Sequence, residues 1–474
     1  MPQDVVTADL DWTSDNPYLS GPFAPIGPEI EASDLRVISG RIPAEISGAY
    51  MRNGPNPQFK PIAYNYPMDG DGMIHALYFD NGRARYKNRF VLTPGLRAER
   101  RAGRALYGSL FHPVPVDPVV VGPDGDPGPI KSGAYINVCG FGGHVLAFGE
   151  SQPAFAMSGE LETLGAWTAG TDRPVGIGAH NRRHPKTGDL FGIDYSVFEP
   201  LVTVLHIDSG GALKRRIPIA LQHASMIHDF VLTDRHLVLL VGPAVFDVAA
   251  AQAGQAFLQW RPELGMRIGV VRLDDGEATW LDGDAFWVFH FANGFERGGE
   301  IVIDYVRHER LGPGPAGAPP ILRRLSIDLA SKAVREEGVA DFVTEFPRID
   351  DRLDGTVSRL IYSPTLTGTF GAPARPFGIF NALVKTDAES GVAVTHDFGG
   401  SVVGEPIFIP RSGRRAEDDG WIGTFAYDPA SMTSRFVLLD AAHFDAEPAA
   451  VIALPQRVPA GLHGAWIEKG RAGV

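Results

Sequence analysis

The chain has 474 residues, a formal net charge of −13 and one cysteine, Cys139. Proteins that bind nucleic acid normally present a basic face, so the acidic balance argues against that class. A single cysteine excludes an intrachain disulfide and a cysteine-based zinc or iron–sulfur site. The first residues lack the apolar core of a signal peptide, and no window approaches the roughly 18–20 apolar residues that span a bilayer. We therefore expect a cytoplasmic protein.

Short strand-like segments follow one another along nearly the whole chain. They are rich in β-branched and aromatic residues and are separated by turn residues, which is typical of an all-β protein. Asn81 and Gly82 predict a tight hairpin, because Asn-Gly is the strongest short signal for one. The strand-like segments cover residues 49–54, 74–93, 144–151, 189–196, 202–208, 235–243, 267–281, 300–309, 322–329, 358–364, 378–387, 392–400, 420–428 and 434–444.

Helical periodicity is scarce, and we expect a turn or two of helix only within residues 159–167 and 246–260. The Pro/Gly-rich stretches 112–130 and 311–320 are expected to be long loops. Seven four-stranded blades need about 28 strands, which about 400 residues can supply. We predict a seven-bladed β-propeller formed by one domain over residues 1–474, with an irregular N-terminal arm over residues 1–20.

Four of the fourteen histidines stand in contexts that suggest a metal site. All four lie near a strand or its end, and three have large apolar residues beside them. For each one, the plainer explanation is a core histidine with a backbone partner. Their wide separation favours a metal site, because a propeller brings one side chain per blade to a shared axis. They are His180 in VGIGAHNRRH, His228 in SMIHDF, His290 in AFWVFHFANG and His463 in VPAGLHGAW.

Several long motifs resemble those of the carotenoid cleavage oxygenase family. That family includes apocarotenoid oxygenases, the retinal pigment epithelium isomerase and bacterial stilbene-cleaving enzymes. The resemblance runs from about residue 20 to the last few residues. The motifs are GAYMRNGPNPQF, MDGDGMIHALYF, YKNRFV, TEFPRID, GEPIFIPR and LPQRVPAGLHGAW.

The resemblance implies one non-haem Fe(II) per chain on the axis of a seven-bladed propeller, with helices and loops capping the metal-bearing face. The matching ligands are His180, His228, His290 and His463. Neutral imidazoles suit Fe(II), and ligating rings usually donate their other N–H to a carboxylate or carbonyl. The family uses three glutamates for this purpose, which correspond here to Glu150, Glu345 and Glu405.

One position departs from the family pattern. Many members carry a threonine that leans over the iron, whereas the matching stretch here, GAYINVCGFGGH, has Ile136. The methyl groups of Ile136 can narrow an open coordination position, but a role that needs a hydroxyl is lost. No catalytic side chain beyond the metal centre is expected.

By resemblance, the reaction is cleavage of a conjugated C=C bond of a carotenoid or apocarotenoid by O2, giving two aldehydes. The alternative is the same chemistry on the central double bond of hydroxystilbenes or lignostilbenes. An isomerase like the eye enzyme, and a scaffold whose histidines merely pack, are further hypotheses. The small-molecule partners are thus an apolar polyene or stilbenoid and O2.

The predicted substrate tunnel consists of aromatic residues near the motifs and one lysine. Tyr107 and Lys131 are also the candidates for holding a phenol, should the substrate be a stilbenoid. Two loops, 106–121 and 243–260, are more apolar than ordinary loops, which indicates either peripheral contact with a membrane or packing of the loops on the propeller. The sequence leaves the oligomeric state open. The tunnel candidates are Phe59, Tyr107, Lys131, Phe141, Phe289, Phe291 and Trp466.

Overall fold

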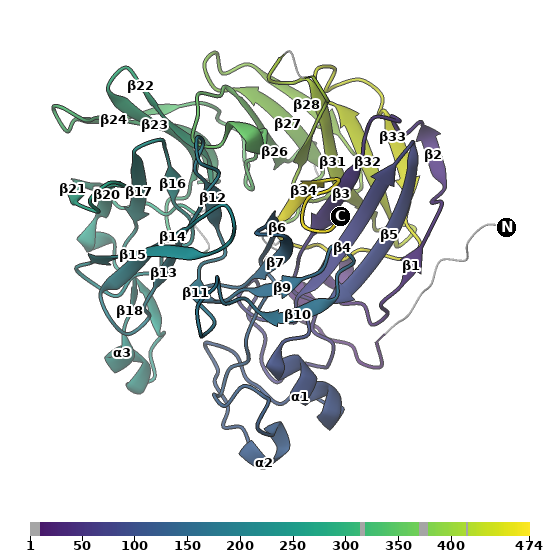
Figure 1. Ribbon diagram of the computed structural model, residues 1–474, viewed down its shortest axis with the longest axis horizontal. Helices are drawn as coiled ribbons and strands as arrows, with labels where there is room; N and C mark the ends of the chain where they lie inside the picture. Colours follow the sequence, from purple (N-terminus) through teal and green to yellow (C-terminus); the bar gives the residue numbers. More distant parts are fainter. Residues whose placement is uncertain (1–9, 313–317, 369–377, 414–415) are drawn as a thin grey trace.

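Seven antiparallel sheets stand around a common hub in the computed structural model, which describes residues 10–312, 318–368, 378–413 and 416–474 (Figure 1). Each sheet of three to six strands is one blade. The predicted seven-bladed propeller is confirmed. Residues 10–30 contain only two 3-10 turns, and residues 1–9 of the expected N-terminal arm lie outside the described part of the chain. The turns are η1 (Pro17–Leu19) and η2 (Gly21–Phe23).

The first four blades follow the chain in order. The first contains β1 (Glu31–Ala32), β5 (Arg83–Phe90), β4 (Met73–Asp80), β3 (Gly48–Arg52) and β34 (Gly464–Glu468). The second contains β6 (Asn137–Phe141), β7 (His144–Phe148), β9 (Phe155–Met157) and β10 (Thr163–Ala166). The third contains β12 (Asn181–Arg183), β13 (Leu190–Tyr195), β14 (Leu201–Ile207) and β15 (Leu213–Ala220). The fourth contains β16 (Val231–Leu232), β17 (His236–Val241), β20 (Met266–Arg272) and β21 (Ala278–Gly283).

The remaining three blades complete the ring. The fifth contains β22 (Phe291–Arg297), β23 (Glu300–Arg307), β24 (Ile321–Asp328) and β25 (Val334–Gly338). The sixth contains β26 (Leu360–Thr365), β27 (Ala382–Asp387) and β28 (Ala393–Asp397). Residues 344–348 run along β26 through two isolated bridges and take the place of its innermost strand. The seventh contains β2 (Val37–Gly40), β33 (Ala450–Ala453), β32 (Thr433–Asp440), β31 (Gly420–Asp428), β29 (Val402–Val403) and β30 (Ile407–Pro410).

Strands from opposite parts of the sequence close the ring. β34 pairs with β3 in the first blade, with Gly464 opposite Arg52, and β2 pairs with β33 in the seventh. Figure 1 accordingly shows the yellow and purple ends of the chain interleaved. Every blade therefore has neighbours on both sides, and the innermost strands are held around the hub.

Local signals explain the predicted hairpin. β4 and β5 pair from Met73–Phe90 to Asp80–Arg83, so that only Asn81 and Gly82 connect them. Both connecting residues have positive φ, 48° and 74°. This backbone matches the type I′ turn that Asn-Gly favours, and the hairpin prediction is confirmed.

The helices lie on the lower side of the ring in Figure 1, with α1 beside α2 and α3 further to the left. α1 begins after Thr93, whose side chain accepts a hydrogen bond from the backbone N–H of Leu96, and ends at Gly103, with φ 66°. These are ordinary capping signals, and Leu96, Ala98 and Glu99 of the helix are buried. The elements at this side are α1 (Pro94–Ala102), α2 (Pro118–Val121), α3 (Val248–Gln252), β8 (Gln152–Pro153), β11 (Gly176–Ile177), β18 (Ala244–Phe246) and β19 (Leu258–Trp260).

Two helical expectations have different outcomes. The expected turn of helix within 246–260 is confirmed by α3, whereas the helix expected within 159–167 is wrong. There, β10 pairs with the preceding strand β9 in a hairpin, and it forms the outer strand of the second blade. Two further 3-10 turns are η3 (Pro262–Leu264) and η4 (Asp351–Leu353). In the described chain, no helix is both long and apolar enough to cross a membrane.

The core is divided into clusters between adjacent blades. One cluster joins β3–β5 of the first blade to β30–β33 of the seventh. Tyr50 is fully buried there, with its ring centroid 4.8 Å from that of Phe436 and 5.1 Å from that of Phe425. Its hydroxyl is buried and has no hydrogen-bond partner among the described residues. The ring of Tyr50 therefore stabilises the blade contact, while its hydroxyl does not.

Replacement of Tyr50 tests this division. We expect Tyr50→Ala to destabilise the protein by about 3–5 kcal/mol, because it opens a cavity between blades. Tyr50→Phe should be neutral or stabilising, because it removes an unsatisfied buried hydroxyl. Denaturant midpoints of the two variants check this, and an unfolding midpoint for Tyr50→Phe as low as that of Tyr50→Ala would contradict it.

Candidate metal centre

Four histidines stand where innermost strands begin. His180, His290 and His463 directly precede β12, β22 and β34, and His228 lies three residues before β16. These strands belong to four different blades and converge at the hub. The propeller thus brings together residues that are as much as 283 positions apart in the sequence, 180 against 463.

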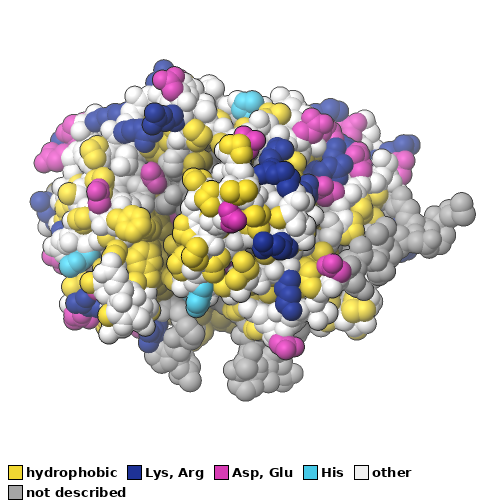
Figure 2. All heavy atoms as spheres, turned by 90° about the horizontal axis from the view of Figure 1, so that it is seen from below, with side chains coloured by type: hydrophobic (Ala, Val, Ile, Leu, Met, Phe, Trp, Pro, Cys, Tyr) yellow, Lys and Arg dark blue, Asp and Glu magenta, His cyan; other side chains and the backbone are white. Residues whose placement is uncertain are grey.

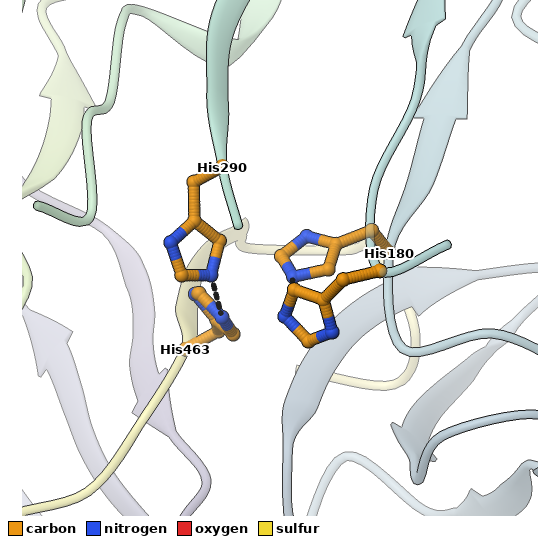
Figure 3. Close-up of side chains that lie close together, drawn as sticks. His180, His290 and His463 are labelled. Atoms are coloured by element: carbon orange, nitrogen blue, oxygen red, sulfur yellow. Dashed lines mark hydrogen bonds between the residues drawn. The ribbon is translucent and has the colours of Figure 1, made fainter. Parts of the chain in front are cut away.

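The four rings form one compact cluster (Figure 3). One nitrogen atom from each ring lies within 4.8 Å of the corresponding atoms of the others. The Nε2 atoms of His180 and His228 are 3.2 Å apart, and those of His290 and His463 are 3.1 Å apart. The exposed fractions of these residues are only 3–9%. The sequence-predicted histidines are therefore together, buried and close enough to share one ion.

Three buried glutamates determine which nitrogen faces the centre. The Nδ1 atom of His228 lies 2.5 Å from Glu150 Oε2, and that of His463 lies 2.9 Å from Glu405 Oε1. The Nδ1 atom of His290 is hydrogen-bonded to Glu345 in the same way. A carboxylate accepts, so each Nδ1 carries the proton and each Nε2 directs its lone pair toward the other rings.

This donor set fits a metal cation. Lone pairs of neutral Nε2 atoms that face each other at 3.1–3.2 Å cannot hydrogen-bond without an additional proton. A cation between them turns the repulsion into coordination. Imidazole nitrogen is a common ligand for divalent iron, zinc, copper and nickel.

The charge around the cluster also suits a divalent cation. Glu150, Glu345 and Glu405 place three carboxylates directly behind the imidazoles. A divalent ion offsets two of these charges. Arg348, whose Nη1 lies 3.4 Å from Glu405 Oε1 and whose Nη2 also pairs with Asp351 at 2.9 Å, partly offsets the third. Such compensation is required because an unpaired buried charge is costly.

Two of the glutamates are held by further hydrogen bonds. Glu345 also accepts from Nε2 of His308 and from the backbone N–H of Phe346, both at 2.6 Å. Burial alone would raise the pKa of Glu345, but His290 and His308 outweigh it and hold that pKa far below its usual value. Burial likewise opposes ionisation of Glu405, yet Arg348 and His463 leave its pKa lowered. Both carboxyls are therefore ionised acceptors.

The imidazoles respond to burial and to their acidic partners. Burial lowers the pKa of His180 well below its usual value, and the other rings lower it further. The pKa of His290 is also lowered by burial, against the opposing effect of Glu345. For His228, Glu150 overcomes the effect of burial and raises the pKa. His180 and His290 are thus predisposed to the neutral form that binds metal.

Ile136 takes the corresponding position in the second blade. It directly precedes β6, its backbone N–H donates to Phe148, and its carbonyl accepts from the backbone N–H of His463 at 3.1 Å. Its side chain is 2% exposed and belongs to a cluster with Phe346 and Leu462. The second blade thus contributes an apolar side chain to the cluster that contains Phe346, whose ring lies 5.0 Å from that of His290 and 5.5 Å from that of His463.

A cleft of about 460 Å³ lies next to Glu150, the hydrogen-bond partner of His228, and is also lined by Glu99 of α1 and Phe246 of β18. It reaches Glu150, whose Oε1 is buried and has no partner among the described residues. Three of the predicted tunnel residues, Phe59, Tyr107 and Lys131, line this cleft. Its other aromatic lining residues are Tyr64, Tyr135, Tyr195, Phe198 and Phe246.

The other four tunnel candidates lie elsewhere. The ring of Phe289 stands 5.7 Å from that of His228, at the edge of the cluster. Phe291 and Trp466 border a second, polar cavity of about 520 Å³ inside the hub. Phe141 packs edge-to-face on Trp167 in the core of the second blade.

Several polar partners at the site carried no obvious sequence signal. His308 and Arg348 contact the glutamates, and Arg182 pairs with Asp229 beneath His180. Asp229 was visible beside His228, and Arg348 within TEFPRID. Their roles depend on contacts between blades, which a single sequence does not reveal.

Comparison with known proteins defines the class. The family model described as retinal pigment epithelial membrane protein matches residues 23–468. A carotenoid cleavage oxygenase of Mycobacterium tuberculosis is 31% identical over 512 residues, covering 96% of this chain and 98% of that protein. The chain therefore belongs to the family of the retinal pigment epithelial membrane protein and the carotenoid cleavage oxygenases.

Solved structures agree with this assignment. The lignostilbene dioxygenase of Pseudomonas brassicacearum superposes with a TM-score of 0.86 at 28% identity, covering 96% of this chain and 99% of that one. Cobalt-substituted apocarotenoid oxygenase of Synechocystis superposes with a TM-score of 0.82 at 28% identity, covering 94% and 97%. Oxygenases of this family act on carotenoids, apocarotenoids and stilbenes.

The glutamate contacts lead to a test of metal binding. We expect Glu345→Gln to weaken Co(II) binding about 10–100-fold, because an amide cannot accept from both His290 and His308 as the carboxylate does. Calorimetric titration and metal analysis measure the affinity and the stoichiometry. Glu296→Gln is the matched control, since Glu296 accepts from His236 at 3.0 Å outside the cluster. Equal affinity of Glu345→Gln and the unaltered protein would contradict the assignment.

Proposed function

We propose that this protein is a non-haem Fe(II) dioxygenase that cleaves a conjugated C=C bond of a carotenoid or apocarotenoid. One O2 is consumed, the double bond breaks, and each of its carbons becomes an aldehyde carbonyl. The observation that carries the proposal is the convergence of four buried imidazoles, one of which bonds to Glu150 at the end of a cleft with aromatic walls. One iron per chain would be held by His180, His228, His290 and His463.

Bound iron would supply the electrons that allow triplet O2 to react with a spin-paired alkene. The chain's own residues provide the surroundings. The glutamates keep the imidazole protons on Nδ1, and Ile136 presents hydrocarbon rather than a hydroxyl toward the cluster. The aromatic walls of the cleft orient the alkene and exclude water. A single functional domain over the whole chain is consistent with this ring, because β34, which directly follows His463, pairs with β3 near the other end of the chain.

The pairing of the Lys131 ammonium with two carboxylates favours a polyene substrate over a phenol. Its Nζ lies 2.5 Å from Asp71 Oδ1 and 2.7 Å from Glu99 Oε2. Burial works to lower the pKa of Lys131, but the two carboxylates raise it above its usual value. A phenolate placed here would meet two negative charges for one positive charge. Tyr107 already donates its hydroxyl hydrogen to the Asp126 carbonyl, at 3.1 Å.

A hydroxystilbene remains the second candidate, because Lys131 and Tyr107 do line the cleft. The lignostilbene dioxygenase that superposes on this chain supports the same alternative. A neutral phenol could hydrogen-bond at this polar end of the cleft without displacing the carboxylates.

Peripheral contact with a membrane would supply a lipid-soluble substrate. Figure 2 shows apolar side chains gathered on the face seen from below in Figure 1, the side of the helices. Val119 in α2 is 89% exposed, Val248 in α3 is 40% exposed, and Phe198 at the cleft is 75% exposed. Exposed apolar side chains beside a cleft mark a surface for lipid or protein.

A substrate panel tests the reaction. The iron-loaded protein is incubated in air with carotenoids, apocarotenals and hydroxystilbenes, and the products are identified by mass. We expect two aldehydes from a polyene and none from His290→Ala, which lacks one imidazole. Isomerised substrate without aldehydes would indicate an isomerase, and a protein that takes up no iron would indicate a scaffold. Either result would overturn the proposal.

Lys131→Met separates the two substrate classes. We expect Lys131→Met to change the cleavage of a polyene and the cleavage of a stilbene to about the same extent. The reason is that the Lys131 ammonium is already paired with Asp71 and Glu99 and is not free to hold a phenol. The kcat/KM ratio for the two substrates measures the difference. A selective loss of stilbene turnover would support the second candidate instead.

Vesicle flotation tests the membrane contact. We expect Val119→Ser combined with Phe198→Ser to reduce binding to phosphatidylcholine vesicles several-fold, because exposed apolar area is lost. Val392→Ser is the matched control, since Val392 is 62% exposed but lies beside β28 of the sixth blade. Equal loss from the control would argue against a specific membrane face.

A further inference from the structure

His180 differs from the other three histidines in lacking a glutamate partner among the described residues. The nearest acidic atom recorded for its Nδ1 is Oδ1 of Asp229, at 3.9 Å, which is too long for a hydrogen bond. Nevertheless its Nε2 points into the cluster and lies 3.2 Å from that of His228. Contacts other than a hydrogen bond to a glutamate must therefore orient the His180 ring.

Asp229, the acid whose carboxylate lies 3.9 Å from the Nδ1 of His180, is held by three hydrogen bonds. Its Oδ2 accepts from Arg182 Nη2 at 2.7 Å and from the backbone N–H of Phe291 at 3.1 Å. Its Oδ1 accepts from the backbone N–H of Phe230 at 2.8 Å. The carboxylate is 1% exposed, and these bonds occupy both of its oxygen atoms. It therefore links the start of the fourth blade to the start of the fifth.

Arg182 completes the same connection from the third blade. Its Nε donates to the carbonyl of Phe230, and its Nη2 also donates to the carbonyl of Phe291, both at 3.2 Å. Its Nη1 lies 3.5 Å from Asp354 Oδ1. A guanidinium can make all of these bonds at once because its donors are fixed in one plane. We call Arg182 and Asp229 the hub ion pair.

The hub ion pair lies next to three metal-site histidines in the sequence. Arg182 is two residues after His180, Asp229 directly follows His228, and the Phe291 to which both bond directly follows His290. A strand advances about 3.3 Å per residue, so a slip of one residue in any of these strands would move its imidazole out of the cluster. The pair joins the three strand starts at the point where such a slip matters most.

We propose that Arg182 and Asp229 are positioning residues for the metal site, which set the spacing of His180, His228 and His290 and the direction of the His180 ring. This inference rests on the proposed metal-binding function. The negative charge of Asp229 faces the Nδ1 side of His180, while Arg182 balances that charge. The glutamates act on single rings, whereas the hub ion pair acts on the relative placement of three blades.

The hub cavity explains why such a device is needed. Both members of the pair border the polar cavity of about 520 Å³, together with His180, His290 and His463. Without the pair, this open space would leave His180 room to rotate away from the cluster. A buried ion pair often contributes little net stability, so its presence here is better explained by the geometry it maintains.

Co(II) binding measures the effect without relying on activity. The variants are Asp229→Asn, which removes the charge, and Arg182→Lys, which keeps the charge but cannot span the Phe230 and Phe291 carbonyls. We expect each to weaken Co(II) binding about 10–100-fold and to alter the visible absorption of the bound Co(II). Because Co(II) binding is measured for both variants, the inference stays testable if one of them fails to fold.

A second buried ion pair provides the matched control. Asp304 and Arg324 bond through two contacts, of 2.7 and 2.9 Å, with side chains 1% and 4% exposed, inside the fifth blade. Asp304→Asn should lower the thermal midpoint as Asp229→Asn does, yet leave the Co(II) affinity within about twofold of the unaltered protein. This separates positioning from general stability.

The outcomes distinguish the two proposals. If the unaltered protein binds no Co(II), both the proposed function and this inference fail. If it binds one Co(II), and the folded hub variants show the same affinity and spectrum, this inference alone is overturned. Equal weakening by Asp304→Asn would also overturn it, because the effect would then reflect stability rather than placement.

Discussion

The hydrogen bond from an imidazole Nδ1–H to a buried carboxylate is the interaction on which the site depends. Three such bonds, to Glu150, Glu345 and Glu405, oblige the opposite nitrogens to present lone pairs to one another. This arrangement is unfavourable in an empty protein core and favourable around a cation. The chemistry of the donor set, rather than the presence of histidine alone, is therefore what distinguishes a metal centre from four packed core residues.

The propeller fold allows these residues to converge without disturbing the sheets. Innermost strands begin at the hub, so each blade can offer the residue at its strand start without altering its own sheet. Four blades offer histidine and one offers Ile136, while the sixth contributes Glu345. The outer strands and the contacts between blades stabilise the fold, whereas the residues at the hub form the candidate metal site.

The sequence revealed those features that depend on local rules or on long motifs. The Asn81–Gly82 hairpin followed from turn chemistry, and the four histidines from their contexts and the family resemblance. The prediction failed in two segments: β10 pairs with β9 in a hairpin where a helix was expected, and α1 was missed although Thr93 and Gly103 cap it and Leu96, Ala98 and Glu99 are buried. The links through Arg182 and Arg348 join residues up to 172 positions apart, so no local pattern could indicate them.

The position of His463 at the start of β34 has a consequence for biosynthesis. β34 enters the first blade only after the other six have been made, because it follows them in the chain. A nascent chain that has emerged as far as β33 holds three imidazoles and an unclosed ring. A metal ion at the hub would thus meet all four imidazoles only once the last strand has inserted, which would couple metal binding to closure of the ring.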